Sequence, residues 1–142
     1  MSSYPLLRAS GAASLRVGTD LVDVETVADS IRVFGSRYLT RLFTLHERQY
    51  CDSVTNAGGD ATPHFAARFA AKEAVIKVLR PPRGEGVAWR SIEVRRHAAG
   101  FCTLRLHGAA HVLARRGRLR KFAISLTHEK QYAVAVAMCE TW

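Results

Sequence analysis

Cysteine is scarce in this sequence of 142 residues, and long apolar runs are missing. The three cysteines, Cys51, Cys102 and Cys139, form no CxxC pair and no Cys/His spacing typical of zinc sites. Their number and spacing argue against a disulfide framework and against a structural zinc site. A reducing, cytoplasmic setting fits best. No apolar run approaches the roughly 20 residues that cross a bilayer, and the start of the chain lacks a secretory signal pattern, so we expect no membrane partner.

Acidic residues are also few. Twelve Asp and Glu residues stand against 21 Lys and Arg residues, which leaves a formal net charge of +9. Such an imbalance favours polyanionic partners, which include nucleic acids, phosphorylated cofactors and acidic proteins. The sequence contains neither a G-x-G-x-x-G fingerprint nor a P-loop, so these two glycine-rich phosphate sites are excluded. Charge alone does not separate the remaining partners.

The length and composition predict one globular domain. A chain of 142 residues falls within the usual domain size of roughly 100 to 150 residues. Hydrophobic residues make up 48% and charged residues 23%, which allows a buried core. Residues 1–14 show no clear periodicity, so we expect a flexible N-terminal extension followed by the domain over residues 15–142.

Helical periodicity dominates the first half of the chain after an initial strand. Residues 15–24 are β-prone and predict a buried strand that carries Asp20 near its end. Apolar spacing then predicts two short helices within residues 27–43 and a long helix over residues 64–79. Between them, a helix over residues 45–54 is predicted to begin at a capping box formed by Thr44 and Glu47.

The second half is mainly β-prone. Strands are predicted over residues 92–96, 102–106, 122–127 and 132–138, with a helix over residues 108–116. The resulting order is a strand, helices, a strand pair, a helix and a second strand pair. We therefore expect an α+β fold in which an antiparallel sheet packs with helices.

The long helix carries a lysine in an unusual place. Phe65, Phe69 and other apolar residues share one face, yet Lys72 falls in the middle of this stripe, with Arg68 and Glu73 at its margins. Two interpretations are open for Lys72: a lysine that extends to water or pairs with a neighbouring acid, and a functional cation.

The charged residues of this helix, together with a carboxylate on the first strand, favour a functional site. Asp20 on the first strand and Glu73 on the long helix provide carboxylates, whereas Arg68, Lys72 and Lys77 provide positive charge. Mg²⁺ in proteins prefers a few carboxylates together with phosphate oxygens and water. These residues therefore form a candidate Mg²⁺ and phosphate site.

Four motifs resemble the holo-[acyl-carrier-protein] synthase type of 4′-phosphopantetheinyl transferase. The family forms are G-x-D-[IL]-V, R-F-A-x-K-E-A-x-x-K, W-x-x-I-E-V, and S-L-[ST]-H followed by Y-A-x-A. In this chain they correspond in order to residues 17–22, 68–77, 89–94, 124–128 and 132–135. The resemblance implies an α+β phosphopantetheinyl transferase fold, assembled as a homotrimer with active sites between subunits.

The resemblance also implies a reaction and roles for residues. The reaction transfers 4′-phosphopantetheine from coenzyme A to a serine of an apo acyl carrier protein and releases adenosine 3′,5′-bisphosphate. By resemblance, Asp20 and Glu73 bind Mg²⁺, and the base is Glu73 or a metal-bound water. Cations and one histidine would hold coenzyme A: Lys77 at the pyrophosphate, Arg68 and His128 at the phosphate end of the nucleotide, and Lys72 as a phosphate contact or as an orienting group for the carboxylates. The other five histidines form no metal motif and are assigned no role.

A basic face is the candidate docking site for the carrier. Arginines recur along the two short helices and at the start of the next one, at positions Arg32, Arg37, Arg41 and Arg48. Acyl carrier proteins are acidic, so charge complementarity favours contact there.

Departures from the family pattern bear on the choice of carrier. Thr26 replaces a frequent arginine, Arg80 a glycine, and Cys102 a proline. These changes leave open whether the carrier belongs to fatty-acid or polyketide synthesis.

The alternative function is a small basic nucleic-acid-binding module. The net charge permits this interpretation, but the basic residues are spread out and no aromatic RNP-like strand, zinc finger or basic-aromatic tract is present. The module would also leave Asp20, Lys72 and Glu73 unexplained. We therefore expect no nucleic-acid partner.

Overall fold

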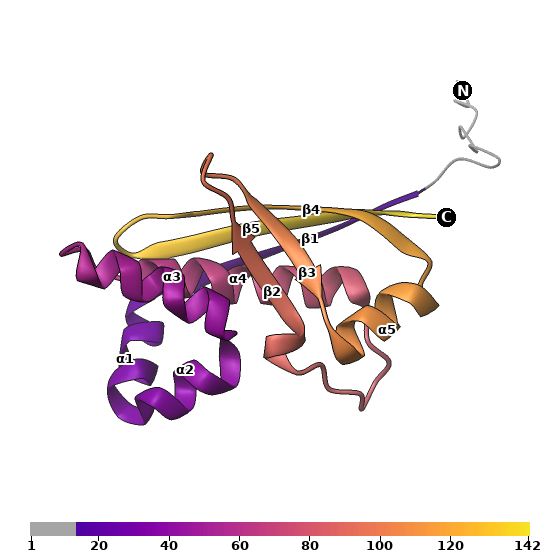
Figure 1. The fold of residues 1–142 in the computed structure, drawn as a ribbon. Helices are drawn as coiled ribbons and strands as arrows, with labels where there is room; N and C mark the ends of the chain where they lie inside the picture. The colour runs from indigo at the N-terminus through magenta and orange to yellow at the C-terminus, as the bar shows by residue number, and fades with distance from the viewer. Residues whose placement is uncertain (1–13) are drawn as a thin grey trace, which may run out of the picture.

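The computed structural model describes residues 14–142 as helices and strands packed around one core. Long strands lie above a long central helix, and shorter helices gather at both ends of that helix (Figure 1). The elements in chain order are β1 (Ser14–Asp23), α1 (Val24–Phe34), α2 (Ser36–Leu42), α3 (Leu45–Asn56), α4 (Thr62–Leu79), the 3₁₀ turn η1 (Trp89–Ser91), β2 (Ile92–Arg96), β3 (Cys102–Leu106), α5 (Gly108–Arg116), β4 (Leu119–His128) and β5 (Tyr132–Thr141).

The strands form two antiparallel sheets. The larger sheet has the order β1-β5-β4, and β2 pairs with β3 in a separate hairpin. Val22 and His128 both lie opposite Ala133, one on each side of β5, so the ends of β1 and β4 that carry Asp20 and His128 lie at the same end of the sheet. The α+β prediction with antiparallel strands is confirmed.

Small residues allow α4 to pack closely on this sheet. Ala133, Ala135 and Ala137 of β5 are buried and alternate along the strand, and the alanines at positions 70, 71 and 74 of α4 are fully buried. A Cβ atom on Gly18 of β1 would lie 2.2 Å from the carbonyl oxygen of Ala74, so only glycine fits there. This close approach fixes α4 against the β1 side of the sheet.

The predicted elements match the structure with small boundary shifts. β2, β3 and α5 have the expected limits, whereas α4 begins two residues early, at Thr62, because Pro63 is well suited to the first helical turn. β4 begins at Leu119 instead of residue 122, since a register shift between Arg120 and Ala123 extends the pairing. The proposed extension over residues 1–14 lies outside the described residues, except for Ser14, which belongs to β1.

The sheet face opposite α4 is apolar and exposed. Leu15, Val17 and Leu21 of β1 lie on this face, as do Val136 and Met138 of β5, and Val17 pairs directly with Met138. We call these five residues the outer apolar face. No helix within residues 14–142 combines the length and apolar character required to cross a membrane.

Candidate functional site

Two carboxylates and a lysine meet where β1 faces α4. The Nζ atom of Lys77 lies 3.2 Å from Oδ1 of Asp20 and donates a hydrogen bond to the carbonyl oxygen of Thr19 at 2.7 Å. Burial raises the pKa of Glu73, the nearby charge of Asp20 raises it further, and Lys77 opposes this shift. We call Asp20, Glu73 and Lys77 the carboxylate cluster; the structure places these three residues, which the sequence predicts at one site, near one another.

The donor set of the carboxylate cluster fits Mg²⁺. No group of three or more His, Cys, Asp or Glu side chains in a metal-binding arrangement occurs within residues 14–142. Mg²⁺ does not require such a cage, because it is commonly held by one or two carboxylates, substrate phosphates and water. Burial and then the charge of Asp20 raise the pKa of Glu73, so the two carboxylates lie close enough to share a cation.

Arg68 and His128 lie in a second site, a pocket of about 220 Å³. The side chains that line it come from α3, α4, β2, β3 and β4. We call it the histidine pocket, because the rings of His64 and His128 meet edge to face with centroids 4.6 Å apart. Its lining residues are Tyr50, His64, Ala67, Arg68, Arg96, Gly100, Cys102, Leu126 and His128.

The histidine pocket and the carboxylate cluster lie on opposite sides of α4. At 3.6 residues per turn, His64 and Glu73 are separated by nine residues, which is half a rotation around the helix, and Arg68 and Lys77 have the same separation. Asp20 and His128 are on strands β1 and β4, with β5 between them. The body of α4 thus separates the two halves of the expected site within one protomer.

Lys72 belongs to neither half. Its side chain is 0% exposed, and its Nζ atom lies 2.8 Å from Oε1 of Glu47. The ammonium also donates hydrogen bonds to the carbonyl oxygens of Trp89, at 3.1 Å, and Ile92. These contacts use all three N–H groups, so the expectation that Lys72 contacts phosphate or the cofactor is wrong, and the paired lysine is the correct interpretation.

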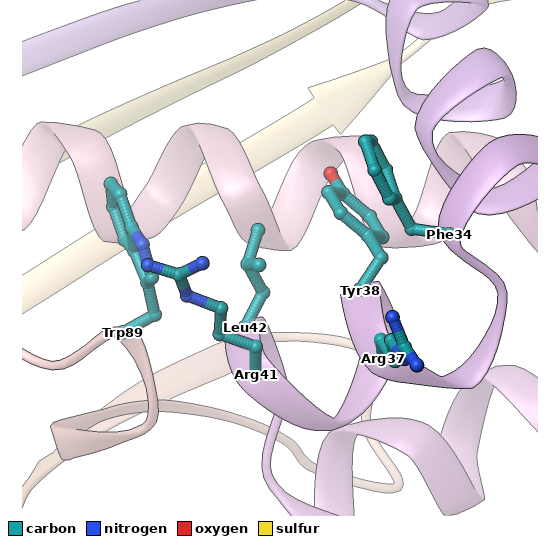
Figure 2. Close-up of a pocket in the computed structure, with 6 residues that line it drawn as sticks. All are labelled: Phe34, Arg37, Tyr38, Arg41, Leu42 and Trp89. Atoms are coloured by element: carbon teal, nitrogen blue, oxygen red, sulfur yellow. The ribbon is translucent and has the colours of Figure 1, made fainter.

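The predicted docking arginines lie in different environments. Arg37 and Arg41 line an open pocket of about 310 Å³ between α2 and η1. Figure 2 shows Trp89 beside Arg41 at one end of this pocket and Phe34 beside Tyr38 at the other. Arg32, in contrast, lies on α1 in an ion pair with Asp29. The Nε atom of Arg48 is buried and has no hydrogen-bond partner among residues 14–142.

Three residues of the histidine pocket were not identified from the sequence. His64 lies one turn before Arg68, so helical spacing could have placed the two side by side. Tyr50 is on α3 and Arg96 ends β2, and only the fold brings them to the pocket.

Comparison with known proteins decides the family. The sequence model of the 4′-phosphopantetheinyl transferase superfamily matches residues 16–137. The chain belongs to this superfamily. The predicted family and the predicted class of enzyme, a holo-[acyl-carrier-protein] synthase, are confirmed, and the nucleic-acid-binding module gains no support.

Relatives in sequence and a solved structure point to the same family. The holo-[acyl-carrier-protein] synthase of Koribacter versatilis is 41% identical over 126 residues, which cover 89% of this chain and 98% of that protein. Its counterpart from Chlamydia pneumoniae is 39% identical, with 87% and 95% covered. The ACPS–CoA complex of Chronobacterium ammoniagenes has a TM-score of 0.79 at 29% identity, with 91% of this chain and 98% of that chain covered.

Proposed function

We propose that this enzyme transfers 4′-phosphopantetheine from coenzyme A to a serine of an apo acyl carrier protein, depends on Mg²⁺, and releases adenosine 3′,5′-bisphosphate. The carboxylate cluster carries this proposal, because Asp20, Glu73 and Lys77 combine metal ligands with a cation suited to a pyrophosphate. The kinship with holo-[acyl-carrier-protein] synthases, one of them solved with CoA, supports the same substrate.

Each member of the carboxylate cluster has a role in this reaction. Asp20 and Glu73 would hold the cation, which when bound would supply Lewis acidity at the substrate phosphates. Lys77 stabilises the charge that develops on the departing phosphate. Glu73 is our candidate to accept the proton of the carrier serine, because its carboxylate lies in the carboxylate cluster beside Asp20 and Lys77.

A homotrimer would unite the two halves of the site. The carboxylate cluster and the histidine pocket are separated by α4 in one protomer, so a coenzyme A molecule held by both halves requires residues from two subunits. The outer apolar face offers a surface for such an assembly, because Leu15, Val17, Leu21, Val136 and Met138 gain from leaving water. We therefore place the active sites between subunits.

The acidic carrier would dock at the pocket in Figure 2. Arg37 and Arg41 supply positive charge above an apolar floor that includes Tyr38 and Leu42. Arg32 can join this face only through a contact that competes with Asp29. A carrier from fatty-acid or polyketide synthesis meets these requirements, and three cysteines without disulfide bonds fit a cytoplasmic location.

The decisive experiment is intact-protein mass spectrometry of an apo carrier incubated with the enzyme, coenzyme A and Mg²⁺. We expect a mass gain of one phosphopantetheine group, which is lost with EDTA. Asp20→Asn and Glu73→Gln should remove the gain, whereas Glu140→Gln, a matched carboxylate change at the far end of β5, should preserve it. No gain with fatty-acid and polyketide carriers, or full transfer in EDTA, would contradict the proposal.

A further inference from the structure

The sequence between Glu93 and Glu129 contains no acidic residue. The same stretch holds eight basic residues: Arg95, Arg96, Arg105, Arg115, Arg116, Arg118, Arg120 and Lys121. The helix α5 lies inside this stretch, so positive charge is concentrated around that helix.

Carboxylates neutralise this charge at the two ends of the stretch but not at α5. One arginine at its start pairs with Glu93, and two basic residues at its end pair with Glu140. Arg115 and Arg116 of α5 are exposed, and neither forms an ion pair within residues 14–142. The helix dipole favours arginines in the last turn, which explains their positions but does not neutralise two full charges. An anionic surface is therefore a favourable neighbour for α5.

The 3₁₀ turn η1 joins α5 to the groove beside α2. The backbone N–H of His107, the residue before α5, donates a hydrogen bond of 2.7 Å to the carbonyl oxygen of Ser91 in η1. Trp89 of η1 and Arg41 of α2 both line the pocket in Figure 2 and also a second open pocket of about 350 Å³. The two pockets therefore adjoin, and we call them together the α2–η1 groove. Both α2 and α5 lie on the side of α4 that faces away from the large sheet (Figure 1).

Exposed arginines follow this path from α2 across η1 to α5. We call them the basic band, which consists of Arg37, Arg41, Arg90, Arg115 and Arg116. Within residues 14–142, no member of the basic band forms an ion pair with a carboxylate. The band thus carries five charges that remain available to a partner.

The groove and the basic band together fit an acidic protein better than a membrane or a nucleic acid. A protein partner can insert an apolar side chain into the groove and place carboxylates over the arginines. A membrane-binding surface instead presents protruding apolar side chains. Single-stranded nucleic acid stacks on a series of exposed aromatic rings, and Phe34 alone is exposed among the aromatic side chains that line the groove.

We propose that the acidic carrier protein contacts α5 as well as the α2–η1 groove, with Arg115 and Arg116 as binding residues. The inference rests on the proposed function for the identity of the partner, and it extends the docking surface from α2 across η1 onto α5. Because α5 supplies no residue of the carboxylate cluster or of the histidine pocket, this contact affects carrier binding and not the chemical step.

Steady-state transfer with Arg115→Glu tests the contact. Reversal of an exposed charge should raise the KM for the carrier roughly 3- to 10-fold at low salt, while kcat and the KM for coenzyme A stay unchanged. Lys130→Glu is the matched control, because it changes the net charge equally and lies in the exposed turn after β4, at the other end of that strand from α5. In about 0.5 M salt the difference between the two variants should nearly vanish, because salt screens exposed charges.

A binding measurement without turnover tests the same contact independently of transfer. The probe is an apo carrier whose target serine is replaced by alanine, passed over immobilised enzyme. Arg115→Glu should weaken its affinity by a similar factor, mainly through slower association, whereas Lys130→Glu should bind as the wild type does.

The outcomes separate this inference from the proposed function. Equal carrier KM values and equal affinities in Arg115→Glu and Lys130→Glu, or a loss that persists at high salt, would overturn the contact with α5 while transfer stands. A wild-type enzyme that binds the carrier without modifying it would contradict the proposed function, and the two variants would still decide the contact. A wild-type enzyme that binds no acidic carrier would overturn both.

Discussion

Lys72 and Lys77 lie five residues apart on α4 and differ in almost every respect. The side chain of Lys72 is 0% exposed and that of Lys77 is 54% exposed, yet each is paired with a carboxylate, at 2.8 and 3.2 Å. The partner of Lys72 is enclosed in the core, whereas the partner of Lys77 faces the candidate active site. Similar ion pairs therefore support the fold in one case and, in the function we propose, the chemistry in the other.

The buried pair connects four elements. Oε1 of Glu47 accepts hydrogen bonds from Lys72 and from the backbone N–H of Thr44, and Oε2 accepts one from the N–H of Val94. Lys72 in turn contacts the carbonyl oxygens near η1 and β2. Every polar atom of this pair has a protein partner, and the ammonium of Lys72 has no N–H group left for a substrate.

The largest effect on stability is expected from Glu47→Ala. This change leaves the ammonium of Lys72 buried without its counterion and should lower the free energy of unfolding by about 3–5 kcal/mol. Urea denaturation measures the loss. The double variant Glu47→Leu with Lys72→Met should lose less than the single variant, and a loss below about 1 kcal/mol in Glu47→Ala would contradict the comparison.

Lys77→Met should show the opposite behaviour. An exposed ion pair contributes little to stability, roughly 0 to 1 kcal/mol. Removal of a cation that stabilises transition-state charge should lower kcat on the order of 100-fold. Parallel measurement of kcat and of urea denaturation distinguishes the two lysines, and wild-type kcat in Lys77→Met would contradict a catalytic role for this side chain.

Gly18→Ala tests the contact that brings Lys77 to Asp20. The added methyl group would meet the backbone of Ala74, which cannot move without shifting α4, and Cβ of Lys77 lies 3.2 Å away. Overpacking of this kind should cost about 1–3 kcal/mol of stability and also reduce kcat. Calorimetric unfolding and transfer assays measure the two effects, and a variant that keeps both would show that the close approach is unnecessary.

The smallest effect is a pH dependence from Glu73. Its pKa is raised in the folded state, so the folded protein binds this proton more tightly than the unfolded chain does. The resulting penalty grows as pH rises from about 4.5 through the raised pKa. In EDTA, Glu73→Gln should therefore be slightly more stable than wild type at neutral pH and equal to it below this range, as measured by unfolding at several pH values. A stability difference that does not vary with pH would show that ionisation of Glu73 is not its cause.

The sequence predicted the carboxylate cluster because its members occur in local motifs. Asp20 lies near a strand end, and Glu73 and Lys77 are one helical turn apart, so their meeting needs only β1 against α4. Glu47 shows what the sequence alone does not predict. Its capping box with Thr44 follows from local spacing, but its contact with Lys72 joins residues 25 positions apart and depends on how α3 packs against α4.

The histidine pocket depends even more on contacts between residues far apart in the sequence. Arg96 ends a strand on the surface hairpin, and no local pattern links it to Arg68 on α4. The motif of residues 68–77 does not by itself show that the two halves of the site are separate, because one continuous run of sequence supplies residues to both. Rotation around the helix places Arg68 and Lys77 on opposite sides.

The most direct test of the divided site is complementation between two inactive variants. Glu73→Gln disables the carboxylate cluster, and the double change Arg96→Gln with His128→Ala disables the histidine pocket. If subunits share each site, random mixed homotrimers should contain about a quarter of sites with both halves intact, and transfer should reappear after the variants are unfolded and refolded together. A mixture that stays as inactive as its separate components, although mixed oligomers form, would contradict active sites built from two subunits.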